Sequence, residues 1–116
     1  MLNSLLSSLI GTNDFDLPKQ KFADGMRKDS DAVLIDTRTK MEYDEGHMPD
    51  AQLIDIMDPQ FREKIDALDR NKSYYMYCRS GNRSGQACKM MLKMGFEKVY
   101  NLQSGVLDWD EPLTTE

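Results

Sequence analysis

The sequence is poor in the side chains that build disulfide frameworks and structural zinc sites. Its 116 residues include two cysteines, Cys78 and Cys88, one histidine, His47, and no Cys-x-x-Cys pair. Two cysteines ten positions apart, one expected in a loop and one within a helix, are not typical of a disulfide framework. We therefore predict a protein of a reducing, cytoplasmic compartment that has no structural metal site.

Basic residues are also scarce relative to acidic ones. Fifteen Lys and Arg against twenty Asp and Glu give a formal net charge of −5. This balance argues against nucleic acid or an anionic membrane surface as a general partner. With 30% charged and 40% hydrophobic residues, the composition is that of a soluble globular protein. The length allows a single domain, which we expect to be monomeric.

The start of the chain lacks the features of an export signal. No Lys or Arg precedes its apolar residues, serines interrupt them, and the stretch is far too short for stable membrane insertion. The apolar residues have helical spacing, namely Leu2, Leu5, Leu6, Leu9 and Ile10. We predict that residues 1–13 form an amphipathic segment that packs on the domain or on a partner, and that residues 14–116 form the domain. Weak contact with a membrane surface is the less favoured alternative, because the polar face has no cations.

Strand and helix patterns alternate along the rest of the chain. Strands are expected at 32–35, 52–54, 73–77 and 98–102, and helices at 18–27, 39–45, 59–68 and 84–94, with a short last helix that holds Trp109. Such alternation predicts an α/β fold with a parallel sheet and helices on both faces. Ligands of such sheets bind at the carboxyl ends of the strands. Asp36 and Cys78 both follow predicted strands, so we expect them to share one site.

The segment 78–85 joins a strand end to a glycine-containing loop and a helix start. A thiol placed there faces unpaired N–H groups and the positive end of the helix dipole, which lower its pKa and make it a nucleophile. Gly81 is free to adopt positive φ and Asn82 tolerates the left-handed conformation, so successive N–H groups can converge on an anion. That anion is the Cys78 thiolate, a persulfide on it, or an oxyanion under attack. The loop adds two cations and two hydroxyl donors, Arg79, Arg83, Ser80 and Ser84.

The length of this loop discriminates between two chemistries. Cysteine-dependent phosphatases have five residues between the cysteine and the arginine of the loop, whereas four residues separate Cys78 from Arg83. A shorter loop makes a narrower cradle, which fits a single terminal sulfur better than a tetrahedral phosphate. The spacing therefore favours sulfur over phosphate as the transferred group.

Several motifs in the expected order resemble the single-domain rhodaneses, a family of sulfurtransferase domains. The matching pieces are 33–38, 42–43, 46–51, 77–84, 95–102, 104–106 and Trp109. Two positions depart from the family pattern: Ser104 stands where a glycine is frequent, and so does Asp50. The resemblance implies a three-layer α/β/α fold around a five-stranded parallel sheet. It also implies that Cys78 accepts a sulfane sulfur as a persulfide inside a cradle formed by Arg79, Ser80, Gly81, Asn82, Arg83 and Ser84.

The expected activity is transfer of a sulfane sulfur through Cys78. The donor is thiosulfate or a persulfide, the acceptor is a thiol, cyanide or a protein, and no metal or organic cofactor is needed. Asp36, Arg38 and Glu42 are expected to support the loop, with a structural and a substrate-binding role both open. The alternatives are a non-catalytic binding or regulatory module, and a phosphatase or arsenate reductase on a related fold.

The two remaining candidates for chemistry are expected to be structural. Cys88 lies beside Ala87 and Met91 in a helix pattern, which favours a small core residue over a resolving thiol. A sulfur relay from Cys78 to Cys88 is the alternative. His47 lies in a turn before Pro49, where a structural hydrogen bond is the expected role.

Overall fold

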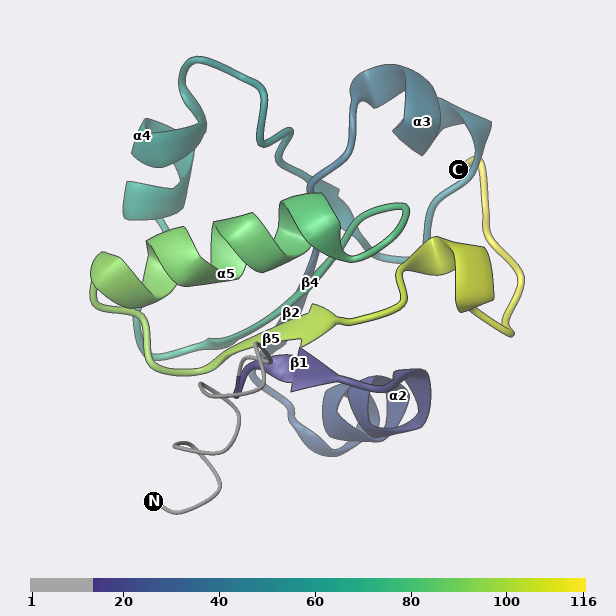
Figure 1. Cartoon of the computed structure of the whole chain (residues 1–116), viewed down its shortest axis with the longest axis horizontal. Coiled ribbons are helices and arrows are strands. Elements are labelled where there is room, and N and C mark those ends of the chain that lie inside the picture. Colours follow the sequence, from purple (N-terminus) through teal and green to yellow (C-terminus); the bar gives the residue numbers. More distant parts are fainter. Residues whose placement is uncertain (1–13) are drawn as a thin grey trace.

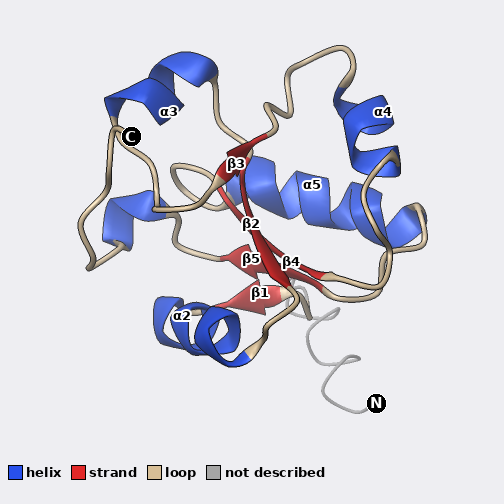
Figure 2. Ribbon diagram, turned by 180° about the vertical axis from the view of Figure 1, so that it is seen from behind, coloured by secondary structure: helices blue, strands red, loops and turns tan. Residues whose placement is uncertain are grey.

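The computed structural model describes residues 14–116 and contains a five-stranded parallel sheet (Figure 2). The strand order is β1-β5-β4-β2-β3, and neighbouring strands are parallel. The strands are β1 (Asp16–Leu17), β2 (Ala32–Asp36), β3 (Gln52–Leu53), β4 (Ser73–Tyr77) and β5 (Val99–Leu102). The predicted α/β class and the five-stranded parallel sheet are confirmed.

Helices cover both faces of this sheet. The helices are α2 (Lys19–Lys28), α3 (Lys40–Glu45), α4 (Phe61–Asp66) and α5 (Asn82–Lys93), followed by the 3-10 helix η1 (Val106–Asp108). Helix α2 lies on one face, and α4 and α5 lie on the other (Figure 1). The arrangement is the three-layer sandwich that the motifs imply.

The central strand β4 explains why the layers stack in this way. All five of its residues are buried. Because side chains alternate along a strand, Tyr74 and Met76 join the core beneath α4 and α5, while Tyr75 and Tyr77 join the core beneath α2. The strand therefore has no solvated face, and Cys78 is the first residue after its end.

The remaining differences from the expected elements concern their ends and one short strand. Helix α5 begins two residues before the predicted start at Ser84, and α4 is shorter than the predicted 59–68. The last helix is a 3-10 turn that ends just before Trp109. Strand β1 was not expected from the residue pattern, because it is only two residues long and is defined by its pairing with Asn101 and Leu102 of β5.

The predicted amphipathic segment 1–13 lies outside the described residues. None of the helices in residues 14–116 combines the length and the apolar character that crossing a bilayer requires.

Candidate active site

Cys78 directly follows β4 at the carboxyl edge of the sheet. The last residue of β4, Tyr77, is paired in register with Asp36 at the end of β2. Thr37, the next residue of that chain segment, donates its backbone N–H and its hydroxyl to the Tyr77 carbonyl at 3.0 and 3.1 Å. These two hydrogen bonds fix the backbone immediately before Cys78. Asp36 and Cys78 thus lie at the ends of adjacent strands.

The loop after β4 folds back over the Cys78 sulfur. Sγ accepts hydrogen bonds from the Gly81 N–H at 3.2 Å and the Ser84 N–H at 3.4 Å, and the Ser84 hydroxyl lies within donating distance of it at 3.3 Å. Burial alone raises the pKa of the Cys78 thiol, but the hydrogen bonds from Ser84, Ser80 and Gly81 outweigh it and lower the pKa. The loop therefore favours a thiolate at the start of α5.

Two glycines allow this loop to pack against the segment that follows β5. Gly81 has φ 91°, and a Cβ there would lie 2.0 Å from the Gln103 carbonyl oxygen. Gly105 has φ 69°, and a Cβ there would lie 2.1 Å from the Arg79 carbonyl oxygen. The Val106 N–H donates to the Cys78 carbonyl at 3.0 Å across the same contact. The cradle is thus held between α5 and the turn before η1.

Glu42 pairs with Arg83, one of the two arginines of the cradle. Its two carboxylate oxygens accept from the Arg83 guanidinium at 2.8 and 2.9 Å. Thr39 and Glu42 also form a capping box at the start of α3, which fixes the carboxylate. The hydrogen bond from Arg83 is the main cause that lowers the pKa of Glu42 to about 2. The bidentate pair therefore joins α3 to the first turn of α5.

Replacing Glu42 with glutamine is expected to destabilise the protein in a pH-dependent way. The pKa of Glu42 is lowered in the folded state from its ordinary 4.5 to about 2, so its stabilisation is fully present above pH 4.5 and is lost as the pH falls through about 2. Urea unfolding should show a lower midpoint for Glu42→Gln near neutral pH and equal midpoints for variant and wild type near pH 2.

Asp44→Asn is the matched control for this comparison. Asp44 lies on the same helix and pairs with Lys40 at 2.7 Å, but both side chains are exposed. An exposed pair contributes little, so this variant should unfold almost as the wild type does at every pH. A midpoint difference for Glu42→Gln that persists unchanged in acid would contradict the assignment.

Asp36 and Arg38 form a second pair, in which both side chains are buried. Arg38 donates to both Asp36 oxygens, at 2.9 to 3.1 Å through Nε and at 2.7 Å through an Nη. The same Nη donates to the Gly46 carbonyl at 2.7 Å, and the guanidinium lies over the Tyr77 ring. The hydrogen bonds of Arg38 therefore tie the α3–β3 connection to the end of β2. Of the three supporting residues, Glu42 is the one with a direct bond to a cradle side chain.

A depression of about 470 Å³ opens beside the cradle. Its lining is Arg38, Glu42, Glu45, Gly46, Arg79, Val106, Leu107 and Leu113. Among residues 14–116 Arg79 takes part in no ion pair, so its charge is available to a ligand, whereas that of Arg83 is engaged by Glu42. Leu107 and Leu113 are exposed at the rim. Cys78 itself is fully buried and does not line the depression.

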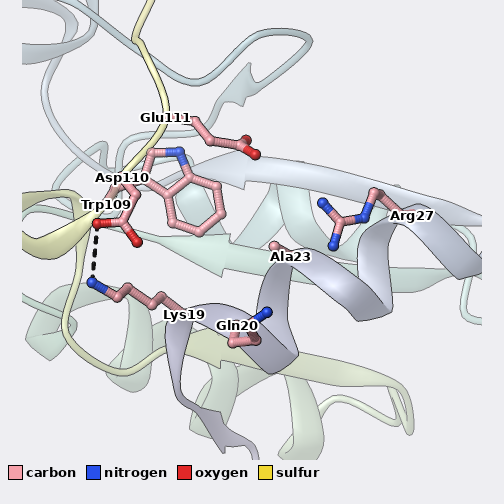
Figure 3. A pocket seen from close by; sticks show the side chains of 7 residues that line it. All are labelled: Lys19, Gln20, Ala23, Arg27, Trp109, Asp110 and Glu111. Atoms are coloured by element: carbon pink, nitrogen blue, oxygen red, sulfur yellow. Dashed lines mark hydrogen bonds and ion pairs between the residues drawn. The ribbon is translucent and has the colours of Figure 1, made fainter.

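A second, smaller depression lies away from the cysteine, between α2 and residues 109–111 (Figure 3). Its volume is about 130 Å³, and two of its lining residues form an ion pair: the Lys19 Nζ is 3.1 Å from the Asp110 carboxylate. The Trp109 Nε1–H is buried there and has no hydrogen-bond partner in the described part of the chain. None of the predicted site residues lines it.

Cys88 and His47 are placed apart from the reactive loop. Cys88 is fully buried in the core under α5, and burial raises its pKa well above the usual range. The His47 Nδ1 is 2.8 Å from the Tyr43 carbonyl, and its ring stacks on Tyr43. Both positions agree with structural roles. Within residues 14–116 no group of three His, Cys, Asp or Glu side chains is placed to hold a metal ion.

Asn101 of β5 is a site residue that the sequence pattern did not reveal. Its side chain lies against the cradle and hydrogen bonds to Ser84, to the Gly81 carbonyl and to Asp16. The available signal was a single amide within an otherwise apolar run from Val99 to Leu102. Asn101 and Gly105 both lie in matching motifs, but nothing local in the sequence marks either as a contact of the cradle, against which Gly105 packs directly.

The fold and the site define a class of protein, namely an α/β domain with a cysteine in an N–H-lined loop at the carboxyl edge of a parallel sheet. The chain belongs to the rhodanese-like domain family, whose family model matches residues 19–112. The resemblance seen in the motifs is thereby confirmed.

Two relatives each match more than two thirds of this chain. A sulfurtransferase of Allochromatium vinosum is 34% identical over 79 residues, which cover 68% of this chain and 72% of the relative. A tRNA uridine(34) hydroxylase of Pectobacterium atrosepticum is 36% identical over 90 residues, which cover 72% of this chain and 25% of the relative. The chain thus matches about a quarter of the hydroxylase.

A solved structure shows the same fold. The crystal structure of a rhodanese-like domain protein from Staphylococcus aureus has a TM-score of 0.75 and 22% identity, and the match covers 87% of this chain and 97% of that one.

Proposed function

We propose that the protein is a sulfurtransferase that carries a sulfane sulfur as a persulfide on Cys78. The observation that carries this proposal is the set of three hydrogen-bond donors on Sγ, together with the lowered pKa of the thiol. The sulfurtransferase name of a relative supports the transferase class. Thiosulfate as donor and a thiol as acceptor go further than that name and form part of the proposal.

The reaction consists of two displacements at sulfur. The Cys78 thiolate attacks the outer sulfur of thiosulfate, the S–S bond of the donor breaks, and sulfite leaves with the bonding electron pair. An acceptor thiolate then attacks the outer sulfur of the persulfide, and the Cys78 thiolate leaves. Both halves proceed without net oxidation, so no redox cofactor is needed, and ping-pong kinetics are expected.

The cradle stabilises the negative charge that sulfur carries in both halves. The N–H groups of Gly81 and Ser84 point at Sγ and are fixed before the reaction, so they need no reorganisation as charge develops. The positive end of the α5 dipole adds to this effect. When the charge lies on the terminal sulfur of the persulfide, these N–H groups act on it from the same fixed positions.

The test of this proposal is direct detection of the persulfide. After incubation with thiosulfate, intact-mass spectrometry should show a gain of one sulfur atom, and peptide mapping should place it on Cys78. Addition of a thiol should then remove it. A protein that gains no sulfur from thiosulfate or from a low-molecular-weight persulfide would favour the non-catalytic binding module instead.

Arg79 is expected to orient an anionic donor at the mouth of the cradle. Arg79→Ala should raise the KM for thiosulfate by roughly three- to tenfold, because one unscreened charge contact at the surface contributes about 1 kcal/mol. The kcat should change less, since Arg79 does not bind Sγ. Arg79→Lys keeps the charge and should retain most of the affinity. A KM that is unchanged in Arg79→Ala, measured at low ionic strength, would exclude this role.

A phosphatase is the alternative enzyme, and activity on an aryl phosphate would distinguish it from a sulfurtransferase. The short loop between Cys78 and Arg83, and the engagement of Arg83 by Glu42, leave no free arginine at the position where phosphate would be held. Hydrolysis of a generic aryl phosphate is therefore not expected.

The partners and the compartment belong to the same proposal. We place the protein in the cytoplasm as a monomer of one domain, residues 14–116, that acts on a small sulfur donor and a thiol acceptor or a protein acceptor. The depression beside Arg79, with its exposed Leu107 and Leu113, has room for an acceptor larger than thiosulfate. The net charge of −5 argues against RNA as a substrate.

A further inference from the structure

The amide of Asn101 and the sulfur of Cys78 lie on opposite sides of one hydroxyl group. The Ser84 Oγ is 2.5 Å from the Asn101 Oδ1 and 3.3 Å from the Cys78 Sγ. All three residues are buried. A serine hydroxyl has a single hydrogen, so Ser84 can donate to only one of these two acceptors at a time.

The orientation of the Asn101 amide is set by its other contacts. Nδ2 donates to the Asp16 Oδ1 at 2.8 Å and to the Gly81 carbonyl at 3.0 Å. Both of these partners accept hydrogen bonds, so a flipped amide would place its oxygen against two oxygens. Oδ1 therefore faces Ser84 and acts there as an acceptor.

The backbone explains why these groups meet. Asp16 of β1 is paired in register with Asn101 of β5, which places the two side chains next to each other. Asn101 faces α5, where Gly85 has no side chain and leaves room for the amide: a Cβ at Gly85 would lie 3.3 Å from Nδ2. Ser84 stands one residue earlier on the same helix.

We propose that Asn101 is a positioning residue that sets the proton state of Cys78 by competing for the Ser84 hydrogen. In the thiol state, Ser84 donates to the Asn101 Oδ1, and its oxygen accepts the S–H of Cys78. When the thiol proton leaves to solvent, the Ser84 hydroxyl rotates and donates to Sγ, and Oδ1 loses its bond. Asn101 thus stabilises the thiol form and raises the pKa of Cys78, whereas the backbone N–H groups lower it.

Other charged and titratable groups act on Cys78 in the background, and a double-mutant cycle removes their contribution because it is the same with and without the Ser84 hydroxyl. Arg83 on α5 interacts electrostatically with Cys78, while Cys88 on α5 stays neutral in its buried position. Asp16 on β1 accepts a hydrogen bond from the Asn101 amide.

The test is a double-mutant cycle read out by the pKa of Cys78. The pKa is measured from the ¹³Cβ shift of Cys78 across a pH titration, which needs no reagent to enter the buried site. Asn101→Leu removes the competing acceptor, so the pKa should fall by about half to one unit, equivalent to roughly three- to tenfold more thiolate below the pKa. In a Ser84→Ala background the same substitution should leave the pKa almost unchanged.

The cycle separates competition for the hydrogen from loosening of the loop. If loss of the Asn101 bond to the Gly81 carbonyl instead loosens the cradle, the pKa of Cys78 should rise, and by the same amount in both backgrounds. A raised pKa, or an equal shift in the two backgrounds, overturns the proposal. Gln103→Leu is the control, because Gln103 is exposed two positions further along the same segment and should leave the pKa at the wild-type value.

A second measurement uses the wild-type protein and does not depend on the folding of a variant. The side-chain carbonyl ¹³C shift of Asn101 should titrate with the same midpoint as Cys78, because Oδ1 loses its hydrogen bond when the thiolate forms. Ser84→Ala should abolish that transition. A flat Asn101 shift in the wild type overturns the proposal.

The relevance of this device to turnover rests on the proposed function. Neither measurement involves sulfur transfer, so a protein without sulfurtransferase activity and a protein without Asn101 competition give distinguishable results.

Discussion

Replacing Cys78 with serine is expected to reduce sulfur transfer by at least about a thousandfold while the fold is retained. A serine hydroxyl does not ionise near neutral pH, so the loop has no anion to present to the donor. Serine is smaller than cysteine but accepts the same hydrogen bonds from Gly81 and Ser84. The unfolding midpoint should therefore stay near that of the wild type.

Cys88→Ala is the matched control for this experiment. It removes the other thiol of the described chain, which is fully buried and has a raised pKa. We expect modest destabilisation from a small cavity, with persulfide formation on Cys78 intact. Steady-state rates with thiosulfate and a thiol, together with intact-mass spectra, measure both variants. Transfer that survives in Cys78→Ser, or disappears in a folded Cys88→Ala, would show that the assignment of Cys78 is wrong.

The parts of the fold that the sequence predicts are those whose signal is local. The apolar run 32–35 and the run 73–77 predict buried strands by their own composition, and Gly46 and Gly95 mark helix ends. Strand β1 has no such signal. Its two residues become a strand because the edge of β5 offers them hydrogen-bond partners more than eighty positions along the chain, which no local pattern contains.

The candidate site divides in the same way. The geometry of the loop from Cys78 to Ser84 can be predicted from the sequence, because the strand end, the glycine and the helix start that determine it are adjacent. The partner of Arg83 lies 41 positions earlier, at Glu42, so the sequence does not tell which arginine is engaged and which is available. Asn101 meets the loop only because β5 lies between β1 and β4 in the sheet.

Gly81→Ala is expected to destabilise the protein by about 3 kcal/mol or more, which is well beyond the effect of positive φ alone. The added Cβ would lie 2.0 Å from the Gln103 carbonyl oxygen and 3.0 Å from that of Leu102. Both obstacles are backbone atoms next to β5, so neither can rotate away as a side chain could. Either the loop or the end of β5 must move.

Gly95→Ala separates the clash from the conformational strain. Gly95 has φ 96°, close to the 91° of Gly81, but a Cβ there would have no atom within 4 Å. Its substitution should cost about 1 kcal/mol from the left-handed backbone alone. Urea unfolding of the two variants measures the difference, and equal losses would mean that the close approach at Gly81 is relieved without strain.

The position of Gly81 also links this stability effect to the chemistry of the sulfur. Any movement that relieves the clash displaces the Gly81 N–H, which donates to the Cys78 Sγ at 3.2 Å. The pKa of Cys78 should therefore rise in Gly81→Ala and stay at the wild-type value in Gly95→Ala, as followed by the ¹³Cβ shift of Cys78. If Gly81→Ala lowers stability but leaves this pKa unchanged, then Gly81 serves only the packing of the loop, and the remaining donors from Ser84 and Ser80 hold the thiolate without it.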